Sequence, residues 1–177
     1  MLTRTLECYI ANGQMVSDKP RTGDWQKYYL KELIWIEYDY AQRACMLLRE
    51  DSREWVINKI KLQRLILEKS LLKIELSTGD IIWQDPINCL SEHIANLLYS
   101  FYNKNCFLTD DDISSLDEQV SYYNDATKIN KIKPPYNKMI IILDLIRHFG
   151  GLTLQDICAL SKRDLDTLYI LARLGLH

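Results

Sequence analysis

The chain has 177 residues, of which 47% are hydrophobic and 26% are charged, and its formal net charge is −2. This length and composition fit one ordinary domain or two small ones, and they exclude an intrinsically disordered chain. Only six glycines and four prolines interrupt the sequence, and its apolar runs are rich in Leu and Ile. We therefore expect an α+β fold that is predominantly helical.

The N-terminus has no apolar stretch followed by small residues, so no signal peptide is expected. The longest apolar runs, such as residues 139–143, are far shorter than the roughly 20 residues that a membrane-spanning helix needs. The five cysteines lie far apart and include no Cys-x-x-Cys pair. An odd number at such spacing is typical of reduced, mostly buried thiols. These features predict a cytoplasmic protein without membrane contact.

The charge is unevenly distributed along the chain. Residues 1–125 carry 14 Lys and Arg against 20 Asp and Glu, a net charge of −6, whereas residues 126–177 carry 8 against 4, a net charge of +4. The change lies next to Pro134-Pro135, which cannot occupy a helix interior. We predict an acidic mixed part over residues 1–125 that binds protein or dimerises, and a basic helical part over residues 126–177.

The first segment contains Asn12-Gly13, a dipeptide that supplies the positive φ values of a tight hairpin turn. A hairpin is predicted there, with a short helix over residues 2–10 as the alternative. In residues 25–47, apolar side chains recur at three- or four-residue steps and predict a helix capped by Asp24. The stretch IWIEYDY suits a strand equally well because it alternates and is aromatic. Residues 53–69 also allow either structure.

Two β-rich runs flank Thr78-Gly79 and predict a second hairpin over residues 71–84. Asp85 and Pro86 then open a predicted helix over residues 87–103, because a proline at the first helical position removes no helical hydrogen bond. Thr109 and Asp112 have the spacing of a capping box and predict a polar helix over residues 110–124. The N-terminal part is thus expected to hold one or two β-hairpins.

The C-terminal sequence predicts three helices. The first, YNKMIIILDLIRHF, ends in cations suited to the negative end of a helix dipole, and Gly150 is expected to close it in the left-handed conformation. Thr153 with Asp156, and Ser161 with Asp164, repeat the capping-box spacing. These two starts predict a short helix over residues 154–160 and another over residues 162–173.

This spacing resembles that of the helix-turn-helix superfamily over about 40 residues. The resemblance implies that the helix over residues 162–173 enters the major groove of DNA and that the preceding helix supports it. The seam between them would consist of Ile157, Leu160, Leu165 and Leu168. Side chains on the final helix would then contact phosphates and base edges, and lysines before it would form a basic arm. These residues are Lys162, Arg163, Thr167 and Arg173, with Lys128, Lys131, Lys133 and Lys138 in the arm.

Other features depart from that pattern. The turn lacks a glycine, and Asp164 and Asp166 would repel phosphate. Ile170, Leu171 and Leu174 make the final helix apolar around most of its circumference, as in a buried or partner-facing helix. Two hypotheses follow: a small cytosolic regulator that binds DNA, and a non-enzymatic adaptor, chaperone or inhibitor whose apolar final helix docks on a protein.

No motif predicts catalysis, a metal site or a cofactor. The three histidines are scattered, and Glu92-His93 lacks the second histidine of a zinc-protease helix. The consecutive carboxylates at 110–112 are poorly placed to converge on one ion, so they are better explained as helix-start charge. Aromatic residues are concentrated in the N-terminal half, where they predict core packing or, alternatively, a tyrosine-rich partner surface. With the −6 charge, that surface would suit a basic protein or a homodimer.

Overall fold

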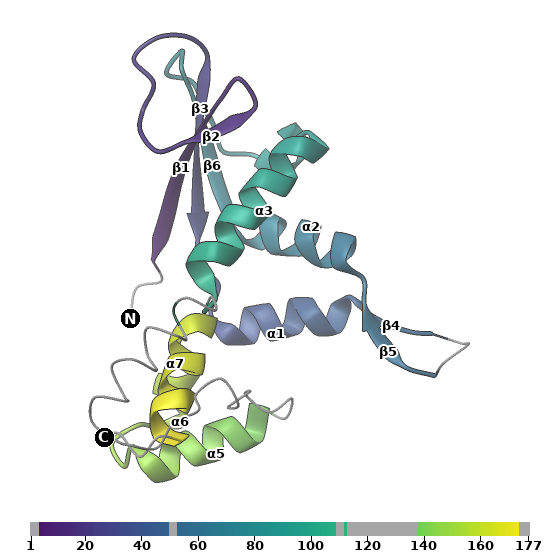
Figure 1. Cartoon of the computed structure of the whole chain (residues 1–177), viewed down its shortest axis with the longest axis vertical. Helices are drawn as coiled ribbons and strands as arrows, with labels where there is room; N and C mark the ends of the chain where they lie inside the picture. Colours follow the sequence, from purple (N-terminus) through teal and green to yellow (C-terminus); the bar gives the residue numbers. More distant parts are fainter. Residues whose placement is uncertain (1–3, 50–52, 109–111, 113–137, 174–177) are drawn as a thin grey trace. The chain divides into compact units, whose positions relative to one another are not determined.

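The computed structural model describes residues 4–49, 53–108, 112 and 138–173 (Figure 1). The chain divides into two compact units, Leu2–Asn105 and Cys106–His177. Among the described residues, the first unit contains all the strands, and the second contains the last three helices. None of the helices among the described residues of either unit is long and apolar enough to cross a membrane.

The first unit is built on a five-stranded antiparallel sheet with the strand order β2-β1-β3-β6-β7. Its strands are β1 (Thr5–Ala11), β2 (Gln14–Val16), β3 (Trp25–Lys31), β6 (Leu71–Leu76) and β7 (Ile81–Ile82). The connection from β3 to β6 contains helix α1 (Trp35–Ala44), a hairpin of β4 (Met46–Leu48) and β5 (Trp55–Ile57), and helix α2 (Lys59–Ser70). A 3₁₀ turn, η1 (Pro86–Cys89), and helix α3 (Glu92–Cys106) follow β7.

This sheet shows that the predicted fold class, predominantly helical with one or two hairpins, is wrong. Trp25–Lys31 was expected to begin a helix but is the central strand, in which Tyr28 pairs with Cys8 on one side and Ile74 on the other. The helical spacing seen over residues 25–47 runs across β3, α1 and the start of β4. Strand pairing prevails because β3 finds a partner along both of its edges.

The stretch IWIEYDY, which suited a strand equally well, is helical. The Glu37 carboxylate accepts a hydrogen bond from the backbone N–H of Ile34 at 3.2 Å and pairs with Lys31 at 3.0 Å, so it satisfies the first turn of α1. Residues 53–69 contain both predicted structures in turn, strand β5 and then α2. The Asn58 side chain caps α2 by accepting a hydrogen bond from the N–H of Lys61 at 3.0 Å.

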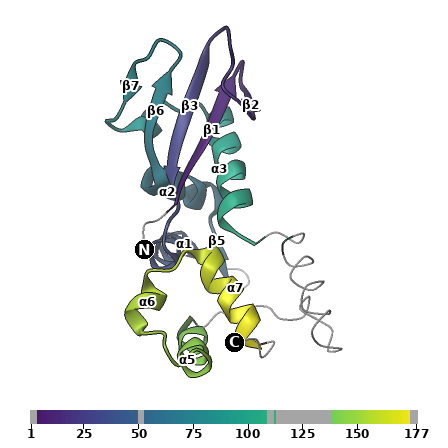
Figure 2. The ribbon, with the colours of Figure 1, turned by 90° about the vertical axis from the view of Figure 1, so that its left-hand side faces the viewer.

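The core of this unit lies between one face of the sheet and the helices α2 and α3. Figure 2 looks onto the other face, with these helices behind the strands. Alternate residues of β1 and β3 are buried with residues of both helices: Leu6, Cys8, Ile10, Tyr28, Leu30, Ile66, Leu67, Leu98 and Tyr102. The buried Tyr102 hydroxyl accepts a hydrogen bond from the N–H of Leu33 at 3.0 Å and thereby fixes the end of β3 to α3.

Both predicted hairpins are present. Asn12 and Gly13, with φ of 51° and 72°, make the turn between β1 and β2, and Gly79, with φ of 93°, lies in the turn between β6 and β7. The helix predicted from Pro86 is interrupted: η1 ends at Cys89 because Leu90 is extended. The α-helix begins only after Ser91, whose hydroxyl accepts a hydrogen bond from the N–H of Ile94 at 3.3 Å.

The second unit contains α5 (Lys138–His148), α6 (Leu154–Cys158) and α7 (Lys162–Arg173). Its core comprises Ile141, Ile142, Leu145, Ile157, Leu160, Leu165, Tyr169 and Ile170. Gly150 does not adopt the expected left-handed conformation, and the chain turns instead with a hydrogen bond from the N–H of Leu152 to the carbonyl of Phe149 at 2.9 Å. Apart from Asp112, the helix predicted at residues 110–124 and the predicted boundary near residues 126–135 lie outside the described residues.

Candidate functional site

The α6–α7 pair has the local geometry that its capping residues predicted. The Thr153 hydroxyl accepts a hydrogen bond from the N–H of Asp156 at 3.2 Å, and the Asp156 carboxylate accepts one from the N–H of Thr153 at 2.9 Å. The Thr153 hydroxyl also donates a hydrogen bond to the Asp156 carboxylate at 2.6 Å. This bond, together with the one from the N–H of Thr153, lowers the pKa of the Asp156 carboxyl below its usual value. The Ser161 hydroxyl accepts a hydrogen bond from the N–H of Asp164 at 3.1 Å at the start of α7. The two helices therefore begin at the residues that the capping-box spacing predicted.

The cations of α7 that were expected to face DNA are engaged within the second unit. Lys162 pairs with Asp166 one turn later. The Arg163 guanidinium lies 2.7 Å from the Asp112 carboxylate, and that of Arg173 lies 2.7 Å from Asp144. The Thr167 hydroxyl donates to the carbonyl of Arg163 at 2.9 Å. Phosphate contact by any of these cations would require the exchange of an existing ion pair.

The solvent-exposed face of α7 carries charges of both signs: Arg173 is exposed, and Lys162 and Arg163 are half-buried. Asp164 is exposed, and Thr167, Leu168 and Leu171 are half-buried. Ile170, expected to contact a protein partner, is only 2% exposed and belongs to the core. Of the remaining predicted site residues, Lys138 is the first residue of α5, whereas Lys128, Lys131, Lys133 and Leu174 lie outside the described residues.

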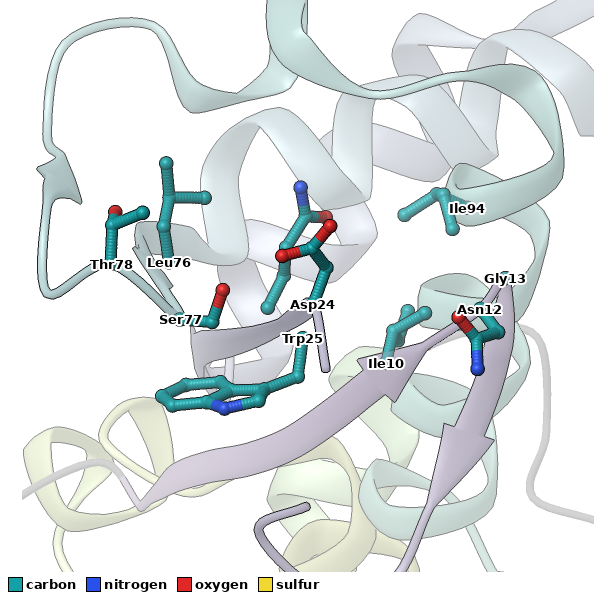
Figure 3. A pocket seen from close by; sticks show the side chains of 10 residues that line it. Ile10, Asn12, Gly13, Asp24, Trp25, Leu76, Ser77, Thr78 and Ile94 are labelled. Atoms are coloured by element: carbon teal, nitrogen blue, oxygen red, sulfur yellow. The ribbon is translucent and has the colours of Figure 1, made fainter. Parts of the chain in front are cut away.

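A pocket of about 430 Å³ lies at the end of the sheet where three connections meet (Figure 3). Asn12 and Gly13 come from the β1–β2 turn, Asp24 precedes β3, and Ser77 and Thr78 follow β6. In Figure 3, Asp24 lies between the Leu76–Thr78 side of the pocket and the Ile94 side, with the Trp25 indole at the base. The pocket thus presents a carboxylate, amides and hydroxyls beside one aromatic ring.

Several of these polar groups are held by neighbours. The Tyr28 hydroxyl donates to the Gln26 side-chain oxygen, and the Thr78 hydroxyl donates to Asp80 at 2.8 Å. Near the rim, the His93 ring nitrogen Nε2 is bonded to the carbonyl of Gly13 at 2.7 Å. Among the described residues, no three or more His, Cys, Asp or Glu gather as metal ligands. The side chains that line the pocket can donate hydrogen bonds to a small polar molecule and accept them from it.

The face of the sheet away from α2 and α3, here called the open face, carries charged and aromatic side chains in cross-strand rows. In one row Tyr9 pairs with Lys27 and Lys27 with Glu75, and in the next Glu7 pairs with Tyr29 and Tyr29 with Lys73. Trp83, just after β7, is 61% exposed. The aromatic residues are evident in the sequence, but only the strand register separates those of the open face from those of the core, such as Tyr28.

Electrostatic contacts connect these rows. The Lys27 ammonium lies 2.6 Å from Glu7, and the Tyr29 hydroxyl donates to Glu75 at 2.7 Å. Burial alone lowers the pKa of Lys27, but hydrogen bonds to Glu7 and Tyr29 outweigh it and hold the pKa above its usual value. Burial and the bond to Glu75 raise the pKa of Tyr29. Both groups therefore keep their protons at neutral pH.

The β4–β5 hairpin, here called the hairpin arm, exposes large apolar side chains. Met46, Leu47 and Leu48 are 40%, 49% and 50% exposed, and Trp55 on the facing strand is 63% exposed. Because neighbouring residues of a strand point to opposite sides, exposure of all three β4 residues leaves both faces of the arm uncovered. Figure 1 shows the arm projecting beyond the ends of α1 and α2. This surface could not be predicted from the sequence, because residues 25–47 suggested one helix and residues 53–69 allowed two structures.

Comparisons of the chain with models of protein families, with curated proteins and with solved structures find no match.

Proposed function

We propose that this chain is a non-catalytic binding protein of the cytosol that assembles with a second copy of itself through the hairpin arm. The observation that carries the proposal is the exposure of every residue of β4, together with that of Trp55. Contiguous exposed apolar side chains are typical of protein-binding surfaces. The docking surface proposed here is therefore the arm, and not the final helix with its buried Ile170.

We favour a second copy of this chain as the partner, because the strand edges of two hairpin arms can pair with each other. Among the residues that the structure describes, β4 and β5 pair only with each other, so the other edge of each strand has no strand partner there. An isolated two-stranded hairpin is marginally stable in water. Pairing across a two-fold axis would turn two arms into one four-stranded sheet and would cover apolar surface on both copies.

Charge does not oppose this assembly. Residues 2–105 carry 14 Lys and Arg and 14 Asp and Glu, so this unit is neutral overall. The excess acid of residues 1–125 comes from residues 106–125, which contain six acidic and no basic residues. The absence of disulfides among the five described cysteines is consistent with the cytosolic location proposed here.

Sedimentation velocity over a range of concentrations tests the proposal. We expect a dimer, and we expect Leu48→Lys to raise its dissociation constant at least tenfold, because a charge would enter the apolar interface of both copies. Leu154→Lys is the matched control, since Leu154 in α6 is 55% exposed and lies outside the arm. A monomer at the highest concentration, or a dimer insensitive to Leu48→Lys, would overturn the proposal.

Duplex DNA binding through α7 is the second candidate. The backbone of the α6–α7 pair and the net charge of +4 over residues 126–177 favour it, whereas the three ion pairs of α7 oppose it. If this candidate is correct, binding to random duplex DNA falls steeply with salt, and Arg163→Ala weakens it. Absence of binding at low salt would exclude it.

A further inference from the structure

The open face places flexible cations directly over aromatic rings. The Lys73 ammonium lies 4.2 Å from the centroid of the Tyr29 ring and 4.8 Å from that of Trp83. Lys27 lies over Tyr29 at 4.5 Å, and Lys19 lies over Trp25 at 4.6 Å. These contacts place lysines and rings of β3, β6 and the residue after β7 on the open face, and Lys19 joins them from the loop before β3. Figure 2 shows the strands of this face in front of the helices.

The lysines differ in their partners. Lys27 is neutralised by Glu7, whereas Lys73 and Lys19 pair with no carboxylate among the described residues. A contact with a ring near the protein surface holds a lysine only weakly. Either side chain can therefore swing from its ring to an incoming anion and leave the ring free for a flat group.

We propose that the open face binds single-stranded nucleic acid, with bases stacked on Trp83 and Tyr29 and phosphates contacted by Lys73 and Lys19. Every unpaired base offers a flat π face, and each such stack contributes about 1–3 kcal/mol. A duplex would leave the rings unused because its bases already stack on one another. An acidic peptide would match the lysines but would offer the exposed Trp83 ring no flat partner.

The acidic residues of the same rows determine how strongly the affinity for a single strand should depend on salt. Glu7 and Glu75 offset part of the lysine charge, so about two phosphates would be neutralised. Affinity should then fall only about sevenfold between 50 and 200 mM salt, by the slope of about −0.7 per phosphate for single strands. This shallow dependence separates the open face from a highly basic surface.

The test is fluorescence anisotropy of labelled 15-nucleotide oligo(dT) and oligo(U) with the full chain. We expect both to bind, duplex of the same length to bind more weakly, and Trp83→Ala to reduce affinity by roughly five- to hundredfold. Trp83→Phe should restore most of the affinity because it keeps a ring. Trp83 is 61% exposed, so thermal unfolding of these variants should match that of the parent chain.

Lys73→Ala should weaken binding and make its salt dependence shallower, because one phosphate contact is lost. Its matched control is Lys69→Ala, which removes an equivalent lysine over the Tyr40 ring, at 5.4 Å, on α2. Equal affinity for duplex, undiminished binding by Trp83→Ala, full displacement by polyglutamate, or no binding of either oligonucleotide at low salt would each overturn the proposal.

Discussion

Individual ion pairs determine what α7 offers to a ligand. Lys162 and Asp166 are four residues apart on one helix, a spacing at which opposite charges attract. The four-residue spacing therefore already indicated that Lys162 pairs with Asp166. Asp166 was nevertheless interpreted only as a charge that repels phosphate. The bond of Arg163 to Asp112 spans 51 residues and could not be read locally.

The Thr153 cap leads to a stability prediction. Thr153→Ala should lower the free energy of unfolding by about 1 kcal/mol, because the N–H of Asp156 loses its side-chain acceptor. Urea denaturation followed by circular dichroism measures this change. Thr22→Ala is the control, since Thr22 is exposed in a loop. An effect as small as that of the control would show that the cap contributes nothing.

The same cap predicts a pH dependence. The pKa of Asp156 is lower in the folded chain than its ordinary value of 3.8, so the folded state binds this proton less tightly than the unfolded state. The cap therefore stabilises the fold fully above that value, and the contribution is lost as pH falls through the folded-state pKa. In Thr153→Ala, carboxyl NMR titration should show the Asp156 pKa partly returned toward 3.8, because the backbone bond remains.

A second prediction on stability concerns the hydroxyl of Tyr102. Tyr102→Phe removes the acceptor of the buried Leu33 N–H, and an unsatisfied buried donor costs about 1–3 kcal/mol. Tyr99→Phe on the same helix is the control, because Tyr99 is half-buried and the described contacts give its hydroxyl no bond. Chemical denaturation compares the two. Equal stabilities would mean that the Leu33 N–H finds another acceptor.

At the scale of elements, the sequence correctly predicted the turns and helices whose ends are determined by residues close to them in the chain. The turns at Asn12-Gly13 and Thr78-Gly79 lie where expected, and α7 has the predicted bounds. Strand β3 was missed because its identity depends on partners at least 14 residues away in β1 and more than 40 away in β6. A propensity for either structure cannot decide such a segment, since tertiary pairing overrides it.

The β1–β2 turn allows a test of this local encoding. Gly13→Ala should destabilise the chain by about 1–2 kcal/mol, because a side chain at φ +72° is strained. The added Cβ would lie 3.8 Å from the His93 ring, an ordinary contact, so the loss would come from the backbone. Gly150→Ala, which meets open space without a positive φ, should show no loss in thermal unfolding. Similar losses in both variants would contradict this explanation.

On the scale of the whole molecule, the candidate sites were harder to predict than the elements. The charge division at residue 125 suggested an acidic N-terminal surface, yet residues 2–105 are neutral and the acid lies in residues 106–125. The pocket in Figure 3 brings together residues from turns far apart in sequence, and the open face needs the strand register to align its lysines and rings. Neither follows from any one segment.

The five thiols differ in burial, so the rates at which they are chemically modified report on the opening of the folded structure. Cys89 is exposed, whereas Cys8, Cys45 and Cys106 are buried, and burial raises the pKa of Cys8 to about 12. Since alkylation proceeds through the thiolate, a buried thiol reacts only when the surrounding structure opens.

With iodoacetamide under native conditions, mass spectrometry should show rapid modification of Cys89, slower modification of the half-buried Cys158, and modification of the other three at the rate of unfolding. Rapid labelling of Cys8 would contradict this order. If this order is observed, labelling of the buried thiols measures the rate at which the sheet separates from its helices, without any added probe.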